Sequence, residues 1–287
     1  MRCSRKKEFP CGSLVLLAPP DAFVPRRFEN VRCDASRREF LLAGLQRLRG
    51  KLYLEDGAIG AEQLCSDGRH RMSGDEHAWH VLSLDRHGHV AGCARYLAHP
   101  NTIAFHRLAV RHAALAESRQ WGGLFRDAVA KDVDLARRRG VAFVEVGGWA
   151  LAPHLRRSRE GLRIALATYG LARALGGCIG ITNATRRHCS SEILRRIGGE
   201  ALRANQVELP AYHDPQYGCE MELLRFDSLH PNPQFEPWVN SMCAQWLSAP
   251  VLREEAAQRT FSRQLQNLAE AVQPTWAFEE NLTLAVQ

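Results

Sequence analysis

The stretch from Val141 to Gly177 constrains the fold of this 287-residue chain more than any other part of the sequence. It opens with an apolar run, VAFVEVGGWALAP, which holds a single acid, Glu145, and is typical of a buried strand. An arginine-rich turn, HLRRSREG, comes next, and an amphipathic helix, LRIALATYGLARALGG, ends in two glycines. We therefore expect a strand at 142–150, a basic turn, and a helix at 161–175.

The basic turn predicts an anion site, because the free N–H groups and the dipole at a helix start both favour negative charge. The residues expected to bind the anion are Arg156, Arg157, Ser158, Arg159 and Gly161. A solvated basic turn without a ligand is the alternative. Glu145 lies just before a strand glycine pair, where another backbone or a ligand can approach closely. The combination suggests an enzyme that binds a phosphate-bearing donor beside an acid.

Composition is that of a soluble globular protein, with 45% hydrophobic and 24% charged residues. The formal net charge of +7 is compatible with nucleic acid, an acidic protein partner or phosphorylated small molecules, and also with an ordinary basic surface. The arginine clusters have no accompanying aromatic platform or recognition motif, so nucleic acid is the weakest of these partners.

The 9 cysteines are scattered and never form C-x-x-C, which argues against a disulfide framework and a zinc site. No ligand spacing recurs among the histidines, so no metal is predicted. The N-terminal apolar run SLVLLA is too short for a signal peptide, and no segment approaches the length of a membrane span. We expect a reduced, cytoplasmic protein.

Periodicity and turn residues predict the other elements. A helix is expected from Ala35 to Arg49, ended by Gly50, and a hairpin from two strands on either side of Arg86-His87-Gly88. The remaining expected elements are helices at 106–117, 122–139 and 190–197, and strands at 178–183, 201–209 and 219–226.

Three segments are predicted: a loosely packed arm at 1–34, a main domain at 35–227, and a helical extension at 228–287. The extension follows a proline-rich linker, HPNPQFEP, and has helical patterns near 238–247 and 251–272.

This element order resembles the GCN5-related N-acetyltransferase fold, and more narrowly the branch of autoinducer synthases and long-chain N-acyl amino acid synthases. The resemblance covers roughly 35–227. It rests on Glu145–Leu151 in place of the strand E-[VI]-x-R-[FL]-x-V, on the hairpin end Ala94-Arg95-Tyr96, and on the helical insertion at 101–140. It implies an α/β (α+β) fold with a mixed, mostly antiparallel central sheet flanked by helices.

Three positions depart from the family pattern. Gly148 stands where autoinducer synthases have a strand arginine, and Arg159 stands where the donor turn has its middle glycine. Ile193–Arg196 occupies the place of the tyrosine acid of many acetyltransferases.

The resemblance implies an N-acyltransferase that moves a medium or long acyl chain to the amine of an amino acid or similar acceptor by direct attack. The donor would be acyl-CoA or a phosphopantetheine-linked acyl carrier protein, with no permanently bound cofactor. An acidic carrier would suit the basic charge. The alternatives are a catalytically silent thioester-binding module and, with less support, a nucleic-acid-binding protein.

Glu145 is expected to accept the amine proton, with a pKa raised by its apolar strand; a structural acid paired with Arg95 is the alternative. Gly147 and Gly148 either form a bulge that frees an N–H for the oxyanion or simply allow close packing. Asn183 lines the donor cleft or caps a helix. The residues expected to contact substrate are Arg95, Trp149 and Asp75, the last within the polar group Asp75, Glu76, His77 and His80.

Overall fold

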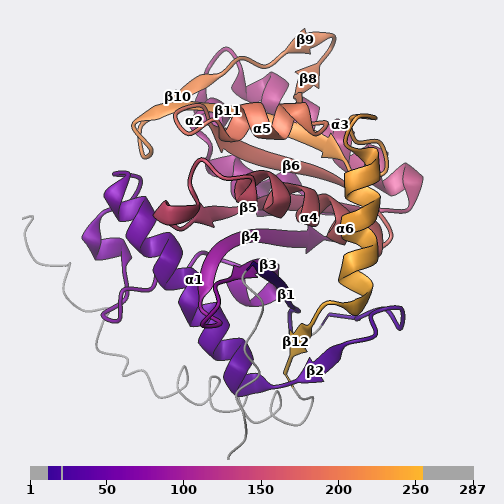
Figure 1. The fold of residues 1–287 in the computed structure, drawn as a ribbon. Coiled ribbons are helices and arrows are strands. Elements are labelled where there is room, and N and C mark those ends of the chain that lie inside the picture. The colour runs from indigo at the N-terminus through magenta and orange to yellow at the C-terminus, as the bar shows by residue number, and fades with distance from the viewer. Residues whose placement is uncertain (1–11, 21, 255–287) are drawn as a thin grey trace, which may run out of the picture.

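A ten-stranded sheet forms the centre of the protein in a computed structural model that describes residues 12–20 and 22–254. The strand order is β10-β11-β6-β5-β4-β3-β1-β12-β2, with β7 paired to β11 (Figure 1). Three pairs are parallel, β5–β6, β1–β12 and β12–β2, and the others are antiparallel. The predicted mixed, mostly antiparallel sheet is confirmed.

The strands of this sheet are β1 (Ser13–Leu17), β2 (Val31–Cys33), β3 (Trp79–Leu84), β4 (Val90–His99), β5 (Ala142–Leu151), β6 (Cys178–Thr185), β7 (Glu200–Ala201), β10 (Tyr212–Asp214), β11 (Cys219–Asp227) and β12 (Val251–Arg253). A separate ribbon pairs β8 (Arg203–Ala204) with β9 (Val207–Glu208). The α-helices are α1 (Ala35–Glu55), α2 (Ala114–Glu117), α3 (Gly122–Arg139), α4 (Glu160–Ala174), α5 (Ser190–Arg196) and α6 (Glu236–Ser248).

Helices cover both faces of the sheet, and the alternation of side chains along each strand divides the core between them. Val144 of β5 packs with α4 and α6, whereas its neighbour Phe143 packs with α3. On the same face as α3, but at the end of the sheet that contains β1 and β3, helix α1 covers β1, β3 and β4. Figure 1 shows α4, α5 and α6 lying together in front of the sheet.

Helix α1 runs past its predicted end at Gly50 and stops at Glu55, with Asp56 as its C-cap residue. A Cβ on Gly50 would lie 2.8 Å from the carbonyl oxygen of Gly68 and 2.9 Å from Leu64. Gly50 therefore serves close packing, and its low helix propensity is outweighed by tertiary contacts.

Both terminal segments contribute strands to the central sheet. The prediction of a loosely packed arm is wrong for β1, whose residues Leu14–Leu17 are buried and which pairs with β3. The helix predicted at 238–247 is confirmed as α6, but Val251–Arg253 forms strand β12 between β1 and β2. Residues 255–272 of that second predicted helix lie outside the described residues.

The hairpin of β3 and β4 and the elements from β5 to α5 are confirmed. Two predictions fail in detail. The helix expected at 106–117 is replaced by two 3₁₀ turns and the single-turn helix α2, and the strand expected at 201–209 is broken into β7, β8 and β9. Asn205 and Gln206 both have positive φ between β8 and β9, which accounts for the reversal of the chain there.

No helix within residues 12–20 and 22–254 is long and apolar enough to span a membrane.

Candidate active site

The sheet opens between β5 and β6. The two strands pair in parallel from Ala142–Cys178 to Val146–Thr182, and beyond that point β5 continues alongside β4 alone. A cavity of about 900 Å³ occupies the opening and its surroundings on both faces of the sheet. We call it the central cavity; its lining includes residues of α1, β4, β5, α4, β6, α5 and β11.

A bulge in β5 shapes this opening. The register between β4 and β5 shifts between Cys93 and Arg95, and Gly148 takes a φ of +59°. A side chain on Gly148 would also approach Arg49 Nη1 to 3.1 Å. The predicted bulge is thus present, because only glycine adopts this conformation at no steric cost.

Glu145 lines the central cavity with its side chain 8% exposed. Its Oε1 accepts the N–H of Val110 at 2.8 Å, and its Oε2 accepts the N–H of Ala109 at 3.0 Å. The Nε2 of His99 lies 2.9 Å from Oε2. Glu145 therefore pairs with His99 and not with an arginine.

The raised pKa expected for Glu145 is wrong. Burial raises its pKa, but the hydrogen bonds from His99 and from two backbone N–H groups outweigh this effect, so the pKa lies below its ordinary value. Hydrogen bonds to the charged form of a carboxylate favour ionisation. Glu145 is a stabilised anion.

Arg95 also lines the cavity and is 4% exposed. Its Nη1 donates to the carbonyl oxygen of Ser73 at 2.8 Å and lies 3.7 Å from Asp75 Oδ1, while its Nε has no hydrogen-bond partner within residues 12–20 and 22–254. Burial lowers the pKa of Arg95, and the repulsion of Arg49 lowers it as well. The attraction of Asp75 raises the pKa but does not compensate, so it stays below its ordinary value.

Asp75 does not line the central cavity, contrary to the prediction that it contacts substrate. It is 1% exposed, and its carboxylate is held by Arg49, with Nη2 to Oδ2 at 2.5 Å and Nη1 to Oδ1 at 3.2 Å. Gln46 donates to the same carboxylate at 3.1 Å. Burial raises the pKa of Asp75, but the hydrogen bond and the charge of Arg49 outweigh this effect, so the pKa lies below its ordinary value. Asp75 is therefore an anion that stabilises the charges of the two arginines.

The basic turn is brought to the cavity in part. Arg156, Arg157, Ser158 and Gly161 line it, whereas Arg159 is exposed and lies outside it. Arg157 has a φ of 66°, an uncommon backbone conformation for arginine. Ser158 Oγ accepts the N–H of Glu160 at 3.1 Å and so holds the start of α4.

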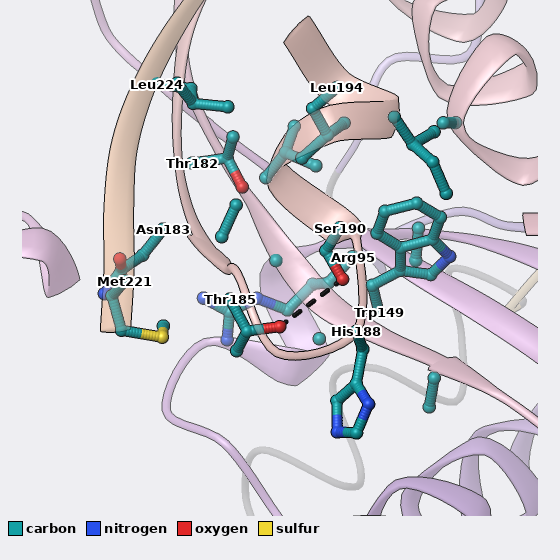
Figure 2. Close-up of a pocket in the computed structure, with 18 of the residues that line it drawn as sticks. Arg95, Trp149, Thr182, Asn183, Thr185, His188, Ser190, Leu194, Met221 and Leu224 are labelled. Carbon is teal, nitrogen blue, oxygen red and sulfur yellow. Dashed lines mark hydrogen bonds between the residues drawn. The ribbon is translucent and has the colours of Figure 1, made fainter. Parts of the chain in front are cut away.

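Trp149 and Asn183 both line the cavity. Figure 2 shows Trp149 of β5 among the lining side chains, together with Thr182 of β6 and Leu194 of α5. Asn183 accepts a hydrogen bond from Tyr212 Oη at 3.0 Å and does not cap α5, whose N-cap residue is Cys189.

Sequence reasoning missed several residues of the site. Tyr53 and Tyr217 line the cavity with ring centroids 6.4 Å apart, and Arg187 and His188 line it from the β6–α5 loop. Arg49 was missed because a helix pattern does not show which cation is buried. Within the described parts of the chain, no group of three or more His, Cys, Asp or Glu side chains is arranged to hold a metal ion.

Comparison with known proteins places the fold. No protein-family model and no curated protein sequence matches the chain. Among solved structures, TofI in a ternary complex with an inhibitor and MTA is similar with a TM-score of 0.50 and 17% identity, over 80% of this chain and 100% of TofI. BjaI, a CoA-dependent acyl-homoserine lactone synthase solved with SAM and isopentyl-CoA, has a TM-score of 0.47 and 15% identity over 85% of this chain and 93% of its own.

FeeM, an N-acyl amino acid synthase from uncultured soil microbes, has a TM-score of 0.37 and 12% identity, over 69% of this chain and 91% of FeeM. At these identities the likeness concerns the fold. With the opened β5–β6 pair and the order of its elements, the chain has the GCN5-related N-acetyltransferase-like fold that its sequence resembles.

Proposed function

We propose that the protein is an N-acyltransferase that transfers an acyl chain from a thioester donor to the amine of a small, anionic acceptor. One observation carries the proposal: a single cavity in the β5–β6 opening joins the basic turn before α4 to the buried Glu145 and Arg95. A donor phosphate at the turn and an acceptor at Glu145 would thus meet between the two strands.

The donor would enter from the side of α4. Arg156, Arg157 and the first N–H groups of α4 suit a phosphate, as found in coenzyme A or in the phosphopantetheine arm of an acyl carrier protein. Arg187 and His188 add further basic groups to the lining. An acidic carrier protein would be attracted by these exposed cations.

An apolar part of the cavity suits the acyl chain. It is lined by Ile164, Ala165, Thr168 and Tyr169 of α4, Ile193 and Leu194 of α5, and Leu224 and Phe226 of β11. Thr168 Oγ1 donates to the carbonyl oxygen of Ile164 at 2.9 Å, so its hydroxyl is already satisfied. An apolar lining drawn from α4, α5 and β11 favours a medium or long acyl chain over an acetyl group.

The acceptor would bind on the other face, beside Glu145 and Arg95. Two buried guanidinium groups, Arg49 and Arg95, share one carboxylate, Asp75, and Glu145 is paired with His99. Because Arg95 shares Asp75 with Arg49 and its Nε has no hydrogen-bond partner among the described residues, Arg95 is suited to bind an anionic ligand group, such as the carboxylate of an amino acid.

In the reaction, the unprotonated amine attacks the thioester carbonyl, the N–C bond forms, and the C–S bond breaks to give an amide and a thiol. A strongly ionised carboxylate is a weak base for a free ammonium group, but it can take the proton from the far more acidic nitrogen of the tetrahedral intermediate. The proton then passes to the departing thiolate. The N–H groups at the Gly147–Gly148 bulge are suited to stabilising the oxyanion.

Expression in a heterologous host followed by mass spectrometry of lipid extracts tests the proposal. New N-acylated amines should appear with the wild-type chain and fall by at least about 100-fold with Glu145→Gln. Glu117→Gln, an exposed acid outside the cavity, is the matched control and should leave the products unchanged. Folded wild-type protein that binds acyl-CoA but forms no product would support the silent thioester-binding module instead.

A further inference from the structure

Glu145 is unusual among the acids of the cavity because each of its carboxylate oxygens is already occupied. Oε1 accepts one backbone N–H and Oε2 accepts another, both from the 3₁₀ turn at Ala109–His112. Oε2 also contacts His99 Nε2 at 2.9 Å. An ionised carboxylate can only accept hydrogen bonds, so His99 donates its Nε2–H here.

His99 is the last residue of β4 and reaches Glu145 diagonally across the β4–β5 pair. In the register of the two strands Glu145 lies opposite Leu97, and His99 lies opposite Phe143. The His99 side chain is 13% exposed and does not line the central cavity. Within the described residues its Nδ1 makes no hydrogen bond, so His99 has a single polar contact, and that contact is Glu145.

The other charged and titratable groups near Glu145 come from the elements packed around it. Arg95 on β4 is attracted electrostatically by Glu145. The surrounding elements also carry Arg49 and Tyr53 on α1, His112 in the turn of the two donating amides, and Asp132 of α3 with its partner Arg225 of β11. Within residues 12–20 and 22–254, none of these side chains makes a hydrogen bond or ion pair with the Glu145 carboxylate, and β6 contributes the apolar Ile181 opposite Glu145. Among the described residues, His99 is therefore the side chain that donates a hydrogen bond to the Glu145 carboxylate.

We propose that His99 is a positioning residue for the acceptor step: together with the two backbone N–H groups, it holds the Glu145 carboxylate in one orientation and in its ionised form. The role rests on the proposed function, in which Glu145 faces the acceptor amine. His99 itself touches neither substrate, and it acts through Glu145.

Loss of the His99 donor has a directional consequence. Burial raises the pKa of Glu145, and without His99 only the two backbone N–H groups would oppose this effect. The pKa of Glu145 would therefore rise. The acid limb of the pH–rate profile, which reports ionisation of Glu145, should move to higher pH.

The test compares His99→Met with His99→Gln, two side chains of similar length of which only glutamine can donate from the position of Nε2. Protein labelled with ¹³C at the glutamate carboxyls is titrated by NMR, and Glu145→Gln identifies the Glu145 signal. The titration midpoint should rise by about one pH unit in His99→Met and by much less in His99→Gln. The acid limb of kcat/KM for the acceptor should shift by the same amount.

A folded His99→Met variant in which neither the carboxyl midpoint nor the acid limb moves would overturn the proposal. Equal shifts in His99→Met and His99→Gln would also overturn it, since a donor at that position would then be irrelevant. The NMR titration needs no substrate, so failure of the proposed function is recognised separately, as a moved carboxyl midpoint in a protein without acyl transfer.

Discussion

At the scale of single residues, the buried charges of the site depend on one another. Arg49 and Asp75 are 0% and 1% exposed, and Arg95 adds a second cation beside the same carboxylate. Removing one partner of such a group leaves an uncompensated charge in a medium that solvates it poorly.

Arg49→Met should therefore reduce the free energy of unfolding by about 3–5 kcal/mol. The matched control is Arg47→Met on the same helix, which breaks an exposed ion pair with Asp67 and should cost less than about 1 kcal/mol. Chemical denaturation of both variants measures the difference. Equal losses would mean that the buried pair contributes no more than a surface one.

Glu145 also links stability to pH. Its pKa is lower in the folded protein than in the unfolded chain, so its contribution to stability is present above the unfolded pKa of about 4.3 and is lost as pH falls through the folded value. The stability difference between wild type and Glu145→Gln should thus shrink as pH falls below about 5. Denaturation curves from pH 7 down to the lowest pH at which both proteins fold would measure it, and a constant difference would contradict the lowered pKa.

At the scale of elements, two helices meet so closely that only glycine fits between them. A Cβ on Gly170 of α4 would lie 2.7 Å from the backbone nitrogen of Cys243 and 2.7 Å from Met242 Cβ, both on α6. The approach holds α6 against the face of α4 that is turned away from the solvent.

Gly170→Ala should destabilise the protein by about 1–3 kcal/mol through overpacking. Gly123→Ala is the matched control, because Gly123 lies in helix α3 with nothing within 4 Å of its Cβ position. That change should stabilise by about 0.5–1 kcal/mol, the gain in helix propensity. Thermal unfolding of the two variants should therefore give shifts of opposite sign.

An aromatic pair lines the apolar part of the central cavity. Tyr169 of α4 and Phe226 of β11 have ring centroids 5.3 Å apart, and a Cβ on Gly180 would overlap the Phe226 ring. Gly180 thus lets this ring lie across β6. The Tyr169 hydroxyl is buried with no hydrogen-bond partner among the described residues.

Tyr169→Ala should enlarge the apolar part of the central cavity. In a series of acyl-CoA substrates of increasing length, the preferred donor should then have a longer acyl chain. Tyr169→Phe keeps the ring and removes only the unpartnered hydroxyl, so chain preference should stay the same. Product yields across the series, measured by mass spectrometry, compare the two. An unchanged preference in both variants would place the acyl chain elsewhere.

At the scale of the whole molecule, strands from the two ends of the described chain pair with each other. Strand β12 lies between β1 and β2 and pairs in parallel with both, so residues near 15 and near 252 share one sheet edge. Figure 1 shows β12 following α6 and running back to β1 and β2.

Leu252→Ala should consequently cost about 2–5 kcal/mol, because Leu252 is 5% exposed within the cluster under α1. Val207→Ala, at a 44% exposed position of β9, is the control and should change stability by less than about 0.5 kcal/mol. If Leu252→Ala proved as mild as its control, the described C-terminal strand would not be part of the cooperative core.

The sequence by itself determined the hairpin of β3 and β4, helix α3 and the elements from β5 to α5, because their hydrophobic periods, turns and glycine caps are local signals. It also drew attention to Glu145, Arg95, Trp149 and part of the basic turn, all of which line the central cavity, since acids and arginines beside a strand–helix junction are visible in the sequence. The fold class followed from the resemblance of this element order to the GCN5-related N-acetyltransferase fold.

Tertiary structure alone decided the rest, because strand pairing and burial join residues that are distant in sequence. The pairing of β12 with β1 made a strand where the local pattern is helical. The hydrogen bonds of His99, Ala109 and Val110, which lie 46, 36 and 35 residues before Glu145, reversed the direction of its pKa shift. The partner of a buried charge depends on the path of the chain through space, and a single sequence does not show that path.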